Sequence, residues 1–151
     1  MPFRICKTFE IESGHLLSKH PGKCRFPHGH SRRIELVLVA DHLDANDMVC
    51  DFKALKDALQ GFVEKWDHAL CINDADPQFA FYQQTYGASI VPFAQTDPTS
   101  EILAQAVFVA AKARLEELSR AKNATYSVSP AIRVERVRVT ETSSSWAEYF
   151  E

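Results

Sequence analysis

Three histidines near the N-terminus have the spacing of a metal site. His28 and His30 are separated by one glycine in the run Cys24-Arg25-Phe26-Pro27-His28-Gly29-His30, and His15 precedes that run. Side chains in a strand repeat every two residues, so His28 and His30 point to the same face. If the strand that carries His15 lies antiparallel beside theirs, three imidazoles converge in the set that holds catalytic zinc with one position open. The spacing favours metal binding over a hydrogen-bonded histidine pair.

Cys24 stands four positions before His28 and permits two interpretations. As a ligand, its thiolate would complete a closed shell of one cysteine and three histidines, which is typical of a structural zinc site. As a free thiolate beside the metal, it would instead remove a proton from a bound substrate. The spacing alone does not choose between the two.

Two further sites carry groups suited to proton transfer and substrate binding. Asp67 and His68 are adjacent at the end of a predicted helix, where the carboxylate could orient the imidazole. The alternative is a helix-end cap with an imidazole at the negative end of the helix dipole. Glu141 follows a predicted strand, where its carboxylate could accept two N–H bonds from a guanidine-like ring edge, or could be an exposed charge.

Basic residues gather around the histidines although the whole chain is acidic. The formal net charge is −3, which argues against a nucleic-acid-binding face. Five basic residues nevertheless lie in or beside the histidine-rich segment: Lys19, Lys23, Arg25, Arg32 and Arg33. They could attract an anionic small molecule, or they could form a solvated loop.

The chain has the size and composition of one ordinary domain. Its 151 residues are 46% hydrophobic and 25% charged, which is enough to bury a core. No signal-peptide pattern and no apolar run long enough to span a membrane occurs. The four cysteines are too scattered for a disulfide framework. We therefore expect a single domain over 1–151, free thiols and a cytoplasmic location.

Apolar periodicity predicts the strands that position these groups. Alternation over 3–11 and an aliphatic run over 33–40 predict two neighbouring antiparallel strands, joined by a loop that carries Cys24. Two later strands are predicted around 132–139, with a bulge near Arg136, and around 146–150.

Capping residues predict two helices between these pairs of strands. The first begins after Asp51 as its N-cap and delivers Asp67 and His68 at its end. The second runs from Asp97-Pro98 to about Ala121, with Asp97 as its cap. The predicted order is therefore β-β-α-α-β-β.

The segment 74–96 is the least regular part of the sequence. Four aromatic residues precede Gly87 and the short apolar run Ile90-Val91-Pro92-Phe93; they are Phe79, Phe81, Tyr82 and Tyr86. We interpret the segment as an ordered insertion. Its aromatic side chains are expected to pack in the core, with a pocket lining as the alternative.

Taken together and in this order, the motifs resemble the 6-pyruvoyltetrahydropterin synthase and 6-carboxytetrahydropterin synthase family over nearly the whole chain. The matching segments are His15, Cys24-x-x-x-His28-Gly29-His30, Met48-Val49-Cys50-Asp51-Phe52 with Leu55-Lys56, Asp67-His68, Asp97-Pro98-Thr99-Ser100-Glu101 and Val139-Thr140-Glu141-Thr142. The short spacer between Cys24 and His28 is more similar to the bacterial carboxy-forming enzymes than to the pyruvoyl-forming animal enzymes. The chain departs from the family pattern in the link after His68, which is one residue longer than usual, and in the 74–96 insertion.

The resemblance implies an α+β tunnelling fold (T-fold), in which an antiparallel four-stranded sheet carries two helices on one face. It also implies trimers that stack into a homohexamer, with active sites between subunits. Zinc would be held by His15, His28 and His30. Cys24, Asp67 and His68 would be catalytic, and Glu141 would anchor the pterin.

The reaction that the resemblance implies starts from 7,8-dihydroneopterin triphosphate. Its products would be 6-carboxy-5,6,7,8-tetrahydropterin, acetaldehyde and triphosphate, an early step toward 7-deazaguanine compounds such as queuosine. Lys23, in the basic loop, is our own candidate for contacting the triphosphate. Two alternatives remain. The first is a pyruvoyl-forming synthase or a related pterin side-chain lyase. The second is a non-enzymatic zinc domain, in which Cys24 is the ligand that completes the coordination shell of the zinc ion.

Overall fold

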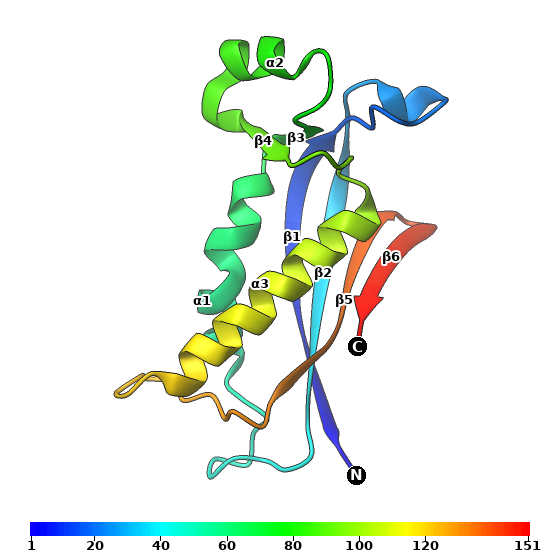
Figure 1. Cartoon of the computed structure of the whole chain (residues 1–151). Helices are drawn as coiled ribbons and strands as arrows, with labels where there is room; N and C mark the ends of the chain where they lie inside the picture. The colour runs from blue at the N-terminus through cyan, green and yellow to red at the C-terminus, as the bar shows by residue number, and fades with distance from the viewer.

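Two long strands form the centre of the sheet. β1 (Phe3–His15) and β2 (His28–Ala40) pair antiparallel over their whole length, from Phe3 opposite Ala40 to His15 opposite His28. In the computed structural model, which describes residues 1–151, this hairpin runs the length of the molecule (Figure 1). The predicted neighbouring strands are confirmed, and both extend several residues further toward the histidines than their apolar patterns indicated.

Two more antiparallel strands follow on the far side of β2. β5 (Arg133–Thr142) pairs with β2, and β6 (Ser145–Phe150) pairs with β5. Val37 lies opposite Arg136 whereas Leu38 lies opposite Val134, so Glu135 is an extra residue in β5. The bulge that the slipped alternation predicts near Arg136 is thereby confirmed.

The sheet has six strands, in the order β4-β3-β1-β2-β5-β6. The predicted four-stranded antiparallel sheet is present, but its strand count needs correction. Two short strands, β3 (Leu70–Asn73) and β4 (Ile90–Phe93), run parallel to their neighbours and extend the sheet beyond β1. Strands of four residues are too short for a period to show in the sequence, and only the pairing of β3 with β1 and of β4 with β3 defines them.

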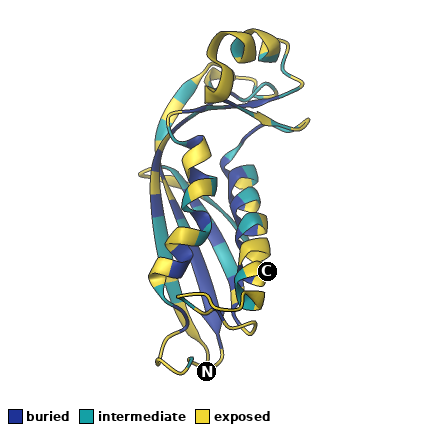
Figure 2. Cartoon of the chain, turned by 90° about the vertical axis from the view of Figure 1, so that its left-hand side faces the viewer, coloured by how far each residue is buried: buried dark blue, intermediate teal, exposed yellow.

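Two helices cover one face of the sheet and enclose the core (Figures 1 and 2). α1 (Phe52–Val63) is followed by a 3-10 turn, η2 (Glu64–Trp66), and α3 (Ser100–Arg120) lies beside it. The core between sheet and helices contains 25 buried residues. Full burial of a large aliphatic side chain stabilises the fold by roughly 1.5–3 kcal/mol, so this layer holds the strand ends in place.

The helix starts test the capping predictions. The carboxylate of Asp51 accepts a hydrogen bond from the Lys53 backbone N–H (2.7 Å), which confirms it as the cap of α1. The cap of α3 is Thr99, whose hydroxyl accepts from the Ile102 N–H, and not Asp97. Asp97 is buried, and its carboxylate instead accepts from the Lys19 backbone N–H and the Asn73 side-chain amide.

Asp97 was wrongly predicted as a cap because three residues in Asp97-Pro98-Thr99-Ser100 can cap a helix. Donors distant in sequence bind the carboxylate of Asp97, which leaves the capping role to Thr99.

The insertion forms a separate layer at the end of the sheet near the histidines. It contains α2 (Phe79–Tyr86), the 3-10 turn η3 (Gly87–Ser89) and β4. No residue of α2 is buried, and its ribbon is largely exposed in Figure 2. Phe79 and Tyr82 pack against a small cluster of Leu16, Ile72 and Ile90. The expectation that the four aromatic side chains of the insertion pack in the core therefore holds only for Phe79 and Tyr82.

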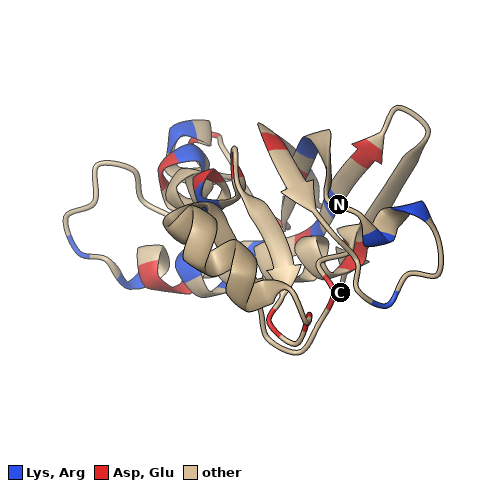
Figure 3. Cartoon of the chain, turned by 90° about the horizontal axis from the view of Figure 1, so that it is seen from above, with Lys and Arg blue, Asp and Glu red and all other residues tan.

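The remaining features concern thiols, charge and hydropathy. All four cysteines are free, as expected. Acidic and basic residues are interspersed along the same elements when the molecule is viewed from above (Figure 3). No helix combines the length and the hydropathy needed to cross a membrane.

Candidate functional site

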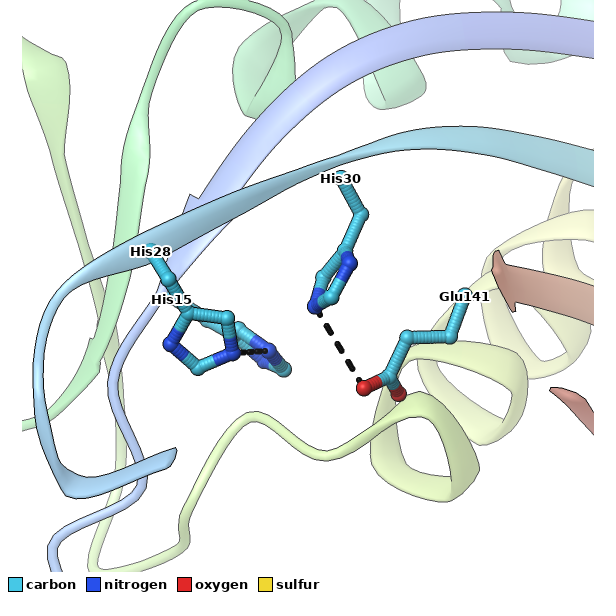
Figure 4. A group of neighbouring side chains, drawn as sticks. All are labelled: His15, His28, His30 and Glu141. Atoms are coloured by element: carbon cyan, nitrogen blue, oxygen red, sulfur yellow. Dashed lines mark hydrogen bonds and ion pairs between the residues drawn. The ribbon is translucent and has the colours of Figure 1, made fainter. Parts of the chain in front are cut away.

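The three predicted histidines converge at one end of the central hairpin. His15 lies opposite His28 in the strand register, and His30 follows two residues later on the same face. Their ring centroids are 4.5, 5.0 and 5.1 Å apart. Figure 4 shows the rings of His28 and His30 on the same side of β2, with Glu141 facing His30. The geometric condition for a three-imidazole site is therefore met within one chain.

Backbone carbonyls set the tautomers of two of these rings. His15 Nδ1 lies 2.8 Å from the Pro98 carbonyl, and His28 Nδ1 lies 2.7 Å from the Phe26 carbonyl. A carbonyl only accepts, so each of these contacts places a proton on Nδ1 and, in a neutral ring, a lone pair on Nε2. Arg32 Nη2 also approaches His15 Nδ1, at 3.2 Å, but the Pro98 carbonyl is the shorter contact. The two Nε2 atoms are 3.0 Å apart, close to the roughly 3.3 Å between two nitrogen ligands of a tetrahedral zinc ion. Two facing lone pairs repel each other, and a cation between them would relieve that repulsion.

Burial favours the neutral form of two of these imidazoles, His15 and His30. His15 is 1% exposed, and burial, aided by the nearby charge of Arg32, lowers the pKa of His15 to about 4. Burial and Arg32 likewise lower the pKa of His30. His30 Nε2 is buried without a hydrogen-bond partner. A neutral, unpartnered imidazole nitrogen is the form that binds a metal.

Glu141, at the end of β5, completes the cluster. One ligand atom each from His15, His28, His30 and Glu141 lie within 4.8 Å of one another. Glu141 Oε1 is 3.3 Å from His30 Nε2, in ion-pair range but without hydrogen-bond geometry. Three imidazole nitrogens and one carboxylate oxygen are a donor set that suits zinc. The residues therefore fit the metal that the resemblance implies.

Arg32 is the residue of this site whose place the sequence analysis did not foresee. It is only 1% exposed, so it is not part of a basic patch that meets an anion from solution. Its Nη1 donates to Ser100 Oγ (3.0 Å), and Ser100 Oγ donates to Glu141 Oε2 (2.5 Å). The sequence could have predicted this position from strand alternation, because Arg32 follows His30 by two residues and so lies on the same face of the strand.

The charge on Glu141 is maintained by these neighbours. Burial raises the pKa of its carboxyl, but the Ser100 hydroxyl, His30 and Arg32 together lower it below the ordinary value. Glu141 is therefore an anion at neutral pH. It faces the His30 imidazole on one side and the buried Arg32 guanidinium, through Ser100, on the other.

Asp67 and His68 are in direct contact with each other. Asp67 Oδ2 lies 3.0 Å from His68 Nδ1, and Asp67 Oδ1 accepts from the Glu12 backbone N–H (2.8 Å). The Glu12 N–H and His68 lower the pKa of Asp67. His68 adopts a left-handed backbone conformation (φ 53°), and its side chain is 78% exposed. α1 itself ends at Val63, and Asp67 is the C-cap residue of η2, the 3-10 turn that continues α1, with its backbone N–H donating to the Glu64 carbonyl (3.1 Å). The helix-end-cap alternative therefore holds for the backbone of Asp67.

His68 lines a cavity that, of the four residues of the metal cluster, only His30 also lines. This cavity, of about 600 Å³, is lined by residues of β1 and β2, by His68, and by Tyr82 and Tyr86 of the insertion. Glu12 and Ser31, which line it and are joined by a hydrogen bond, alternate with the inward-facing histidines. Within one chain, the Asp67–His68 pair and the histidine cluster therefore lie on opposite faces of the sheet. The pocket alternative for the insertion holds for Tyr82 and Tyr86.

Cys24 and Lys23 lie apart from both groups. They belong to a 3-10 turn, η1 (Lys23–Arg25), in the loop between β1 and β2. Cys24 is half-buried, and its carbonyl accepts from the Leu17 N–H (2.8 Å). Its thiol is not a member of the four-atom cluster, in which Glu141 provides the non-histidine atom. The roles of Cys24 and Lys23 stay predictions.

The topology and the site together define a class of protein. A β1-β2-β5-β6 antiparallel sheet with two helices on one face is the T-fold architecture predicted above, here with a cluster of potential metal ligands at the hairpin end. Residues 4–151 match the family model described as 6-pyruvoyl tetrahydropterin synthase. The chain belongs to that family.

Individual relatives agree with this assignment. The chain is 32% identical over 169 aligned residues to the 6-carboxy-5,6,7,8-tetrahydropterin synthase of Aquifex aeolicus, covering 100% of this chain and 99% of the relative. An uncharacterized protein from Wolinella succinogenes has the same fold, with a TM-score of 0.79 and 21% identity over 100% and 99% of the two chains. So does the 6-pyruvoyl tetrahydropterin synthase of Plasmodium vivax, with a TM-score of 0.70 and 13% identity over 100% and 98%.

Proposed function

We propose that this protein is a zinc-dependent lyase that converts 7,8-dihydroneopterin triphosphate to 6-carboxy-5,6,7,8-tetrahydropterin, acetaldehyde and triphosphate. The observation that carries the proposal is the convergence of three imidazoles beside the anionic Glu141. Support also comes from full-length similarity to a relative named for the carboxy-forming reaction. The proposed setting is the cytoplasm and the biosynthesis of 7-deazaguanine compounds such as queuosine.

His15, His28 and His30 would hold the zinc ion. The Pro98 and Phe26 carbonyls orient two of these rings so that Nε2 points into the cluster. When bound, zinc supplies Lewis-acid polarisation of the substrate's side-chain hydroxyls, which acidifies the adjacent C–H bonds. This role needs three neutral imidazoles, and burial lowers the pKa of His15 and of His30 in the required direction.

Cys24 and the Asp67–His68 pair would move protons between the substrate's side chain and its ring. Asp67 accepts from the Glu12 N–H and pairs with His68, so the imidazole has a fixed orientation and an exposed far edge. Because this pair lies on the opposite face from the histidine cluster, a single chain does not bring His68 to a substrate at its own cluster. We therefore propose the homohexamer of two stacked trimers that the resemblance implies, in which one chain's His68 serves another chain's cluster.

Two residues are assigned to substrate binding. Glu141 would accept the N–H groups of the pterin ring edge, since its carboxyl is kept ionised by Ser100, His30 and Arg32. Lys23, exposed in η1, would contact the triphosphate. A Lys23→Ala variant should bind the triphosphate substrate more weakly while its affinity for dihydroneopterin is unchanged; equal affinity for the triphosphate would exclude Lys23.

The experiment that tests the proposal is mass spectrometry of the products. Zinc-loaded protein is incubated with 7,8-dihydroneopterin triphosphate, with Cys24→Ala as the control. We expect carboxytetrahydropterin and acetaldehyde from the wild type, and loss of turnover with retained zinc and fold in the variant. A pyruvoyl product would move the protein to the other branch of the family. Release of zinc and unfolding on the Cys24→Ala change would instead identify a structural zinc domain.

A further inference from the structure

The carboxylate of Glu141 has its two oxygens in different environments. Oε2 accepts a hydrogen bond from Ser100 Oγ. Oε1 faces His30 Nε2 at 3.3 Å without forming a hydrogen bond. Its polar neighbour in the cluster is thus the buried His30 Nε2, which has no hydrogen-bond partner. An anionic oxygen in that position is favourable when a cation shares the centre of the cluster.

The distances agree with a four-atom ligand set. Two contacts around the cluster, His15 Nε2 to His28 Nε2 at 3.0 Å and His30 Nε2 to Glu141 Oε1 at 3.3 Å, are close to the roughly 3.3 Å edge of a tetrahedral zinc shell. The widest separation in the set is 4.8 Å at most. Small side-chain rotations would therefore bring all four atoms onto one ion.

Arg32 limits how Glu141 can bind a metal. Through Ser100, its guanidinium keeps Oε2 engaged, so only Oε1 is available to an ion. Arg32 is also a buried positive charge, 1% exposed, next to the cluster. It attracts Glu141 and repels a cation at the histidines. Both effects make Glu141 a weaker ligand than an isolated carboxylate, and hence one that a competitor can displace.

We infer that Glu141 is an exchangeable fourth metal ligand, which leaves the ion when a pterin ring edge offers it N–H donors. This inference rests on the proposed function, in which the same carboxylate anchors the pterin. Withdrawal of Oε1 would free a ligand position that the substrate's hydroxyl could take. Ser100 and Arg32 act as positioning residues, because they hold Oε2 throughout the exchange.

The test compares metal affinity in three proteins without any turnover. Zinc affinity is measured by competition with a chelator for the wild type, for Glu141→Gln and for the control Glu35→Gln. The control removes a charge from the opposite face of β2. We expect Glu141→Gln to weaken zinc binding by about 10- to 100-fold, and Glu35→Gln to leave it unchanged. A second variant, Glu141→Asp, keeps the charge but shortens the side chain, and should show an intermediate loss. Wild-type affinity in both Glu141 variants would overturn the inference.

The exchange itself is tested on cobalt-substituted protein. Adding 7,8-dihydroneopterin should change the cobalt absorption spectrum of the wild type, as a carboxylate leaves and a hydroxyl enters. The spectrum of metal-loaded Glu141→Gln should already differ from that of the wild type before the pterin is added. Identical starting spectra would overturn the inference. Failure of the wild type itself to bind zinc or cobalt would instead contradict the proposed function, so the two failures are distinguishable.

Discussion

The two faces of the sheet use histidine in opposite ways. On the helix-covered face, His15 is 1% exposed and its pKa is lowered to about 4, so the ring is a neutral lone-pair donor. On the outer face, His68 is 78% exposed and is paired with the carboxylate of Asp67. Burial suits a ring to holding a cation, whereas exposure beside a carboxylate suits a ring to exchanging protons with an arriving group. The comparison supports the proposal that one face binds the metal and the other transfers protons.

The largest effect is expected on the outer face. His68→Ala should reduce turnover of dihydroneopterin triphosphate by roughly 100- to 10,000-fold, the usual range for loss of a general acid or base. Zinc content should stay at the wild-type level, because His68 is not a member of the metal cluster. Parallel steady-state kinetics and metal analysis measure both quantities. Loss of zinc together with activity would show that the two faces are not separate in function.

The converse change tests the helix-covered face. His28→Ala should weaken zinc binding on the order of 100-fold, since each ligand of a zinc site supplies several kcal/mol of the total binding free energy. The exposed Asp67–His68 pair should be unaffected. Chelator competition measures the zinc affinity, and the chemical shifts of the His68 ring report on the outer face. Unchanged zinc affinity would show that the metal does not bind on the helix-covered face.

A third difference between the faces should appear in the pH dependence of stability. In metal-free protein, His15 has a folded pKa of about 4 against an ordinary value of 6.5. The unfolded chain therefore binds a proton that the folded chain does not. The free energy of unfolding should fall as the pH drops below about 6.5 and level off below about 4. The expected loss is about 3 kcal/mol.

Urea unfolding at several pH values, with a chelator present, measures this loss. A His15→Gln variant should show a shallower dependence on pH than the wild type. His42→Gln, at an exposed position, is the matched control and should behave as the wild type does. A slope that is the same in all three proteins would mean that burial of His15 is not the cause.

The smallest effects on stability and zinc affinity are expected at the starts of the two helices that cover the face with the histidine cluster. Thr99→Ala removes the cap of α3 and should cost about 1 kcal/mol. The adjacent Pro98 carbonyl and Ser100 hydroxyl contact the cluster, so zinc affinity should also fall, by about two-fold. Asp51→Ala, at the start of α1, should cost a similar amount of stability and leave zinc affinity unchanged. Equal zinc affinities in the two variants would show that the α3 start does not support the cluster.

Much of the fold was predictable because long strands and helices repeat their apolar residues over many positions. The β1-β2-β5-β6 strands and a bulge near Arg136 were apparent in that way, and the Asp51 cap was apparent from the side chain that precedes α1. The short strands β3 and β4 were not, because four residues carry no measurable period. Asp97 was misjudged as a cap because hydrogen bonds from Lys19 and Asn73, distant in sequence, determine its role.

For the site, the sequence by itself determined which residues could bind a metal. The His28-Gly29-His30 spacing places two imidazoles on one face of any strand, and an antiparallel neighbour adds His15. Tertiary structure alone decided the rest. It buried Arg32 behind Ser100 and Glu141, brought Tyr82 and Tyr86 beside His68, and separated His68 from the cluster by the sheet. The physical reason is that periodicity is a property of one strand, whereas burial and charge pairing depend on which elements pack together.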